Sequence, residues 1–207
     1  MMKMKRFSNV WFWRCALGSA MAAFCLVSQP GLAQETTNAE RLAAAYPGII
    51  KEISGNDVLF VDGSSLPFDD GKGVKPFEAW LESADIEDMF AQPYRKGAVP
   101  QPGREQDPGR ARNEAFFLKV YGDCRRGEVE ARLVEVVWLP KKGRQVLKVS
   151  AVNGMADRLA AVSAELDELP ASFDRDLKTT ASTYNCRVIA GTNRLSGHAF
   201  GTAIDIA

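Results

Sequence analysis

The chain has 207 residues, 46% of them hydrophobic, and its 26 acidic residues equal its 26 basic residues in number. This length suits one domain with an ordinary hydrophobic core. A nucleic-acid-binding protein needs a basic face, and without an excess of positive charge we expect no nucleic-acid partner.

The first 33 residues predict a secretory signal peptide. A basic leader without acidic residues precedes the apolar run CALGSAMAAFCLV, which is too short to span a bilayer stably. Gly31 and Ala33 are small residues just before a cleavage point at Gln34. We therefore expect an exported, periplasmic or cell-wall-associated protein. Its mature part, residues 34–207, would be one domain without a membrane span, with 22 basic against 26 acidic residues and a net charge of −4.

Two cysteines, Cys124 and Cys186, lie beyond the predicted signal peptide. In an oxidising compartment, two such cysteines most often pair with each other. The sequence therefore predicts a disulfide between Cys124 and Cys186.

The first elements of the mature part alternate between helix and strand. Residues 35–47 predict a short helix that ends at Pro47, and residues 48–63 predict a hairpin around the turn SGND. Residues 75–90 have the apolar spacing of a helix. The segment 91–110 contains prolines and glycines throughout and predicts a long irregular loop, a kind of segment that is often functional or mobile.

The second half begins with a predicted helix over residues 111–122 and a second hairpin over 128–152 around the basic turn KKGR. The clearest helix follows over 153–170. Its apolar stripe has helical spacing and comprises Met155, Leu159, Val162, Leu166 and Leu169. Strands and helices come in mixed order without regular βαβ alternation, which predicts an α+β fold with a small, mostly antiparallel sheet and flanking helices.

The last fifteen residues, NRLSGHAFGTAIDIA, contain His198, the only histidine of the chain. In the expected final strand, Ile204 and Ile206 would face the core and Asp205 the opposite side. Imidazole together with carboxylate is the ligand chemistry of a catalytic zinc, which normally takes three protein ligands. The alternative is a solvated histidine in a loop and an aspartate that caps a strand end.

The pattern Ser196-x-His198-x-x-Gly201-x-Ala203-x-Asp205 resembles the signature of the zinc D-Ala-D-Ala carboxypeptidase and dipeptidase family, the vancomycin-resistance type of peptidoglycan peptidase. The resemblance covers most of residues 45–207 and implies that family's catalytic core. Segments that resemble one exported bacterial branch of the family are CRVIAGTNRLS, DIEDMFAQPY, DPGRARNEAFFLKVYG and VNGMADRLAAVSAELDELP.

The resemblance implies a role for each matching residue. His198 and Asp205 would be the first two zinc ligands, and Ser196 would lie near the substrate. Arg187 would steady the substrate carboxylate or the developing oxyanion, since a guanidinium is planar and always charged. Arg194 would contact the substrate, although a surface or ion-pairing role is an equal alternative for both arginines. The cofactor would be zinc and the partner a peptidoglycan stem peptide, cleaved next to D-alanine.

The sequence departs from the family in one respect. Family members take a third ligand, a histidine, and a general-base glutamate from a segment beyond the signature, and this chain has no second histidine. Cys124 or a carboxylate could replace the missing ligand. We expect the 207 residues to be a C-terminally truncated form of a longer enzyme, with little or no hydrolysis alone.

Two further hypotheses use the same segment. Cys186, His198 and Asp205 could form a cysteine–histidine–acid nucleophilic set, which needs a free thiolate. Alternatively, the chain could be a non-catalytic exported module that binds cell-wall peptides, or an inactive gene remnant.

Overall fold

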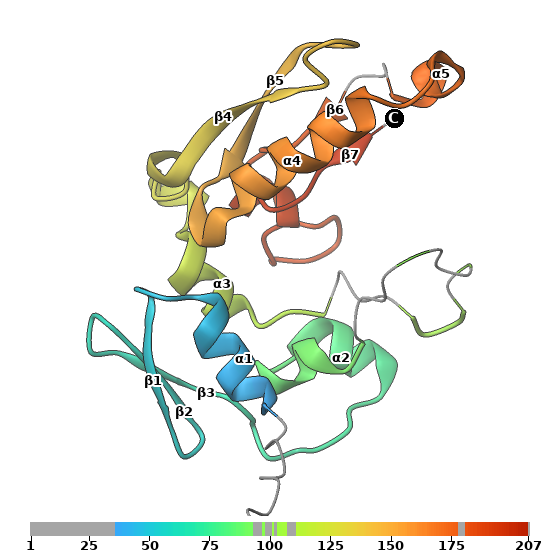
Figure 1. Ribbon diagram of the computed structural model, residues 1–207. Helices are drawn as coiled ribbons and strands as arrows, with labels where there is room; N and C mark the ends of the chain where they lie inside the picture. Colours follow the sequence, from blue (N-terminus) through green and yellow to red (C-terminus); the bar gives the residue numbers. More distant parts are fainter. Residues whose placement is uncertain are drawn as a thin grey trace, which may run out of the picture. The chain divides into compact units, whose positions relative to one another are not determined.

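The computed structural model describes residues 36–92, 97, 101, 103–106, 111–177 and 181–206. The predicted signal peptide lies outside these residues, and so does most of the loop expected over 91–110. The described part combines helices with small antiparallel sheets, so the expected α+β class is confirmed (Figure 1).

Among the described residues, the strands form three small antiparallel sheets, whereas the sequence predicted one sheet. Both predicted hairpins are present, and each belongs to a separate sheet. The first sheet has the order β1–β2–β3, and the other two are the pairs β4–β5 and β6–β7. The strands are β1 Ile50–Ser54, β2 Asp57–Phe60, β3 Ser65–Pro67, β4 Leu133–Trp138, β5 Gln145–Ser150, β6 Ala181–Ser182 and β7 Asp205–Ile206.

The predicted helices lie close to their expected positions, with one exception, and one short α-helix was not predicted. The α-helices are α1 Asn38–Ala45, α2 Phe77–Ser83, α3 Glu114–Tyr121, α4 Met155–Asp167 and α5 Asp174–Leu177. The helix expected over 75–90 is divided into α2 and the 3-10 turn Glu87–Phe90. Asp85 and Asp88 cause the break, because each carboxylate accepts a hydrogen bond from the other residue's backbone N–H, at 2.8 and 3.0 Å.

Two main hydrophobic clusters support these elements. The first joins α1, β2 and α3 to residues Ser196–Asp205, the C-terminal motif. It includes Phe60, Phe116 and Phe200, all of them at most 1% exposed. In the second, α4 packs along the β4–β5 hairpin (Figure 1). The predicted stripe of α4 contributes to it except at Val162, whose side chain is 49% exposed, so that part of the prediction was wrong.

A disulfide connects Cys124, three residues after the end of α3, to Cys186, ten residues before Ser196, as the sequence predicted. The two Cα atoms are 5.7 Å apart and the residues are 62 positions apart in the chain. Within the described residues, none of the helices has the length and apolar character needed to cross a membrane.

We predict that the double substitution Cys124→Ser and Cys186→Ser lowers the free energy of unfolding by about 3 kcal/mol, because the bond closes a long loop and restricts the unfolded chain. Urea unfolding of both proteins, followed by tryptophan fluorescence, measures the difference. Equal midpoints and slopes would contradict a stabilising role for the bond.

Candidate functional site

The C-terminal motif forms a short 3-10 turn, Gly197–Phe200, between two caps. Ser196 begins the turn, and its hydroxyl accepts a hydrogen bond from the backbone N–H of His198 at 3.4 Å. Gly201 ends the turn in the left-handed region at φ 65°. The two caps hold His198 and Phe200 in the interior, at 7% and 0% exposure.

Gly201 is required at its position for two reasons. Its positive φ disfavours any residue with a side chain. A Cβ atom there would also lie 2.6 Å from Leu133 Cδ2 and 3.1 Å from the backbone nitrogen of Ser150. That close approach allows the Gly201 carbonyl to accept a hydrogen bond from Ser150 N–H at 3.0 Å, which joins the motif to β5.

The His198 ring is oriented by a backbone carbonyl. Its Nδ1 lies 2.6 Å from the carbonyl oxygen of Thr183. A carbonyl only accepts hydrogen bonds, so Nδ1 must carry the proton, and in the neutral ring the lone pair is on Nε2. The Thr183 hydroxyl in turn donates to the carbonyl of Lys148 in β5, at 2.7 Å. The arrangement matches the second-shell support that metal-binding histidines receive.

Asp205 lies opposite this free nitrogen. The β6–β7 pairing places Ser182 opposite Asp205, and Asp205 Oδ2 is 3.2 Å from His198 Nε2. The Asp205 side chain is 69% exposed, as expected for a residue that faces away from the core. Ile206 is 45% exposed, which contradicts its expected place in the core, whereas Ile204 packs against the second hydrophobic cluster.

The spacing of these two atoms is compatible with a shared zinc ion. Two ligand atoms about 2.0–2.2 Å from a tetrahedral zinc lie about 3.3–3.5 Å apart, close to the 3.2 Å between Nε2 and Oδ2. Among the described residues, no cysteine and no further carboxylate lies close enough to this pair to be a third ligand. Cys124 and Cys186 are bonded to each other, which removes Cys124 as a ligand and Cys186 as the thiolate of a nucleophilic set.

The remaining predicted site residues flank the pair in different ways. Arg187 has an exposed side chain, and its carbonyl accepts a hydrogen bond from the backbone N–H of Ser196 at 2.9 Å. Arg187 and Ser196 therefore face each other across a short antiparallel connection, and their roles stay predictions. Ser196 is 6% exposed and its hydroxyl already serves as the cap of the turn.

Arg194 is engaged with the protein itself. Its guanidinium donates to the carbonyl oxygens of Leu81 and Arg112 and lies 3.8 Å from the Glu114 carboxylate. These contacts favour the structural alternative for Arg194, because the same nitrogens are not open to a substrate.

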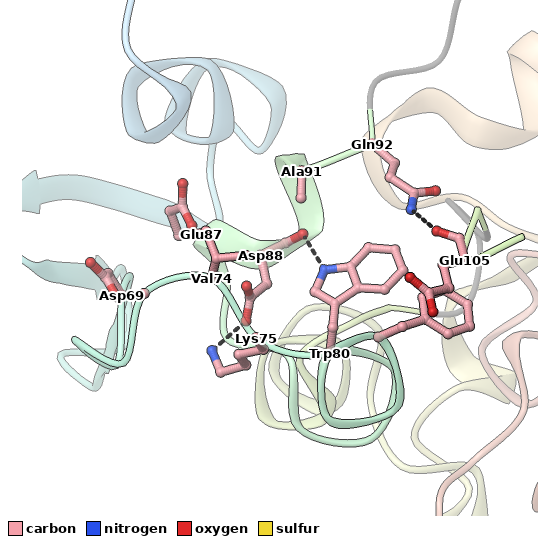
Figure 2. A pocket seen from close by; sticks show the side chains of 11 residues that line it. Asp69, Val74, Lys75, Trp80, Glu87, Asp88, Ala91, Gln92 and Glu105 are labelled. Carbon is pink, nitrogen blue, oxygen red and sulfur yellow. Dashed lines mark hydrogen bonds and ion pairs between the residues drawn. The ribbon is translucent and has the colours of Figure 1, made fainter.

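Two acidic clusters elsewhere have metal-compatible spacing, which the sequence analysis missed. They are Asp69, Asp70 and Asp85, and Asp85, Glu87 and Asp88. Figure 2 shows that the amino group of Lys75 lies at this site and contacts Asp88. It also lies 2.9 Å from Asp85 and 3.2 Å from Asp70. The acid-rich segment around Lys72 and Lys75 was the sequence signal for this cluster.

Lys75 therefore supplies a positive charge to this cluster. Its side chain is only 6% exposed. Burial opposes the charge, but hydrogen bonds to Asp88, Asp85 and Asp70 outweigh it and raise the pKa of Lys75. Burial, followed by the nearby charges of Asp85 and Asp88, raises the pKa of Glu87. The cluster could take a metal by its spacing, but nothing in it points to zinc in particular.

Comparisons with family models, with curated proteins and with solved structures gave no match for this chain.

We predict that Gly201→Ala lowers the free energy of unfolding by at least about 3 kcal/mol, because the added Cβ meets both strain and a close contact. Gly191→Ala is the matched control, with φ 77° and no atom within 4 Å of the new Cβ, and should cost about 1 kcal/mol. Denaturant unfolding compares the two, and equal losses would show that the contact with β5 is not restrictive.

A second prediction concerns Lys75. Lys75→Met leaves buried carboxylates without their partner and should cost about 3 kcal/mol at pH 7. The exposed Lys72 is the control, and Lys72→Met should cost less than about 1 kcal/mol.

The effect of Lys75 depends on pH in a defined direction. Its folded-state pKa is raised, so its contribution is complete below the unfolded value of about 10.4 and declines as the pH rises towards the folded value. The difference in unfolding free energy between the wild type and Lys75→Met should therefore be smaller at pH 11 than at pH 7. A difference that stays constant or grows would contradict this assignment.

Proposed function

We propose that the protein is a zinc-dependent peptidase of the D-Ala-D-Ala carboxypeptidase type, acting in the periplasm or cell wall on peptidoglycan stem peptides. The observation that carries the proposal is the pairing of His198 Nε2 with Asp205 Oδ2, with the other ring nitrogen fixed by the Thr183 carbonyl. The same two residues stand at the ligand positions of the motif that resembles this family. The leader pattern and the disulfide support export.

The residues of this proposal have different tasks. His198 and Asp205 would hold the zinc, which when bound polarises the scissile carbonyl and lowers the pKa of its bound water. Thr183 keeps Nε2 of His198 directed at Asp205. The exposed guanidinium of Arg187 would bind the substrate carboxylate or stabilise negative charge that develops on the carbonyl oxygen.

A second candidate is a module that binds cell-wall peptides without cutting them. It is favoured by the size of the ligand set, because only two of the usual three protein ligands come together among the described residues. In this case zinc or the His198–Asp205 pair would have a structural or binding role. Hydrolysis and binding therefore have to be measured separately.

We predict that His198→Ala and Asp205→Asn each weaken zinc binding by more than about tenfold, since each removes one ligand atom. Zinc affinity is measured by competition with a chromophoric chelator. Asp57→Asn, which changes an exposed carboxylate of β2, is the matched control and should bind zinc like the wild type.

Hydrolysis of a peptide that ends in D-Ala-D-Ala is then followed with and without zinc. Zinc-dependent cleavage that both ligand variants lose supports the peptidase. Zinc binding that depends on both residues, together with peptide binding but no cleavage, supports the second candidate for these 207 residues. Zinc affinity that neither substitution changes would overturn the metal site itself.

A further inference from the structure

A cavity of about 630 Å³ opens beside the C-terminal motif. Its wall includes residues of α1 and α3 and the motif residues Gly197, Thr202 and Ala203, which flank His198 in the chain. Its volume lies within the range of small-molecule sites, and most of its lining is apolar or aromatic. The cavity therefore has the size to hold a short peptide against this part of the motif.

The charged lining of this cavity has one sign. Of the described residues that line it, two are charged, and both are arginines, Arg41 and Arg112. Arg41 is exposed on α1, whereas Arg112 is 7% exposed. A positive cavity in a chain with as many acidic as basic residues is a local feature, and it favours an anionic ligand.

Of the two arginines, Arg112 indicates more about the ligand, because its charge is poorly compensated. Its Nη2 donates to the carbonyl of Leu195, while its Nε is fully buried without a hydrogen-bond partner. In the part of the chain that the structure describes, no carboxylate forms an ion pair with it. The rings of Phe117 and Phe200 lie 5.5 and 5.8 Å from its guanidinium carbon. Burial, and then the charge of Arg194, lower the pKa of Arg112, and the nearby Glu114 carboxylate opposes this shift only in part.

The two rings restrict the motion of the guanidinium, so that it is preorganised for binding. They supply cation–π attraction, which offsets only part of the cost of burying a charge. Nη1 lies beside the motif, since a Cβ on Gly197 would come within 3.7 Å of it. A guanidinium held in this way keeps its positive charge and can donate hydrogen bonds to a carboxylate.

We propose that this cavity binds the C-terminal carboxylate of a short peptide and that Arg112 is the residue that recognises it. Of the two roles offered for Arg187, this leaves the stabilisation of negative charge on the carbonyl oxygen. The apolar wall would accept small side chains such as the methyl groups of alanine. The choice of a D-alanine peptide as the ligand rests on the proposed function. The carboxylate specificity itself rests on the cavity and on the environment of Arg112 alone.

The test is equilibrium binding of N-acetyl-D-alanyl-D-alanine and of its C-terminal amide, measured by calorimetry in metal-free buffer. The wild-type protein should bind the acid about tenfold or more tightly than the amide, because only the acid carries the charge that Arg112 pairs with. Arg112→Gln should remove this preference. Arg158→Gln removes an equal charge from the exposed face of α4 and should retain it.

Equal binding of acid and amide by the wild type, or binding of neither, would overturn the proposal. This comparison needs no variant, so it remains decisive even if Arg112→Gln does not fold. Propionate is included as a third ligand. If propionate binds as tightly as the dipeptide, the site takes any small carboxylate and the assignment to a peptide end is wrong.

The same titration on His198→Ala separates this proposal from the proposed function. A variant that loses zinc but keeps the preference for the acid would leave the carboxylate site standing while the metal site is tested by itself. The opposite result would be zinc-dependent cleavage by a protein that binds the acid and the amide equally. It would support the proposed peptidase function and exclude Arg112 from substrate recognition.

Discussion

The hydrogen bond between His198 Nδ1 and the Thr183 carbonyl is the interaction on which the candidate site depends. It determines which ring nitrogen faces Asp205 and therefore whether that nitrogen can act as a ligand. Further hydrogen bonds hold this arrangement in place. The Thr183 hydroxyl donates to the Lys148 carbonyl, and the Gly201 carbonyl accepts from the Ser150 N–H. Both partners belong to β5, so the β4–β5 hairpin and the helix packed on it form the base of the motif.

The motif is also held on its other side by elements distant in sequence. The disulfide fixes Cys186, the residue before Arg187, to the end of α3. Arg194 connects the same segment to the carbonyls of Leu81 and Arg112. These connections hold the segment from Cys186 to Arg194, which has little regular structure, at both of its ends. Such support positions the side chains of a loop reproducibly.

The sequence allowed the local elements to be predicted well and their environments less well. The two hairpins, α4 and the disulfide followed from alternation, helical spacing and compartment. The break before Glu87 did not, because it depends on two carboxylates that bond to backbone N–H groups. The pairing of His198 with Asp205 was expected from their types, but the contribution of Thr183 is a backbone carbonyl, which no side-chain pattern encodes.

Two buried cations show how environment separates a structural charge from a candidate functional one. Lys75 is surrounded by carboxylates, so its charge is neutralised within the fold and its loss would leave those acids unpaired. Arg112 has two aromatic rings and one carbonyl instead, in the wall of a cavity that the motif shares. Lys75 and Arg112 are thus buried to a similar extent, but their charges have different consequences for the protein. The fully paired Lys75 stabilises its own segment, whereas Arg112, which forms no ion pair among the described residues, would lower the cost of bringing in an anion from outside.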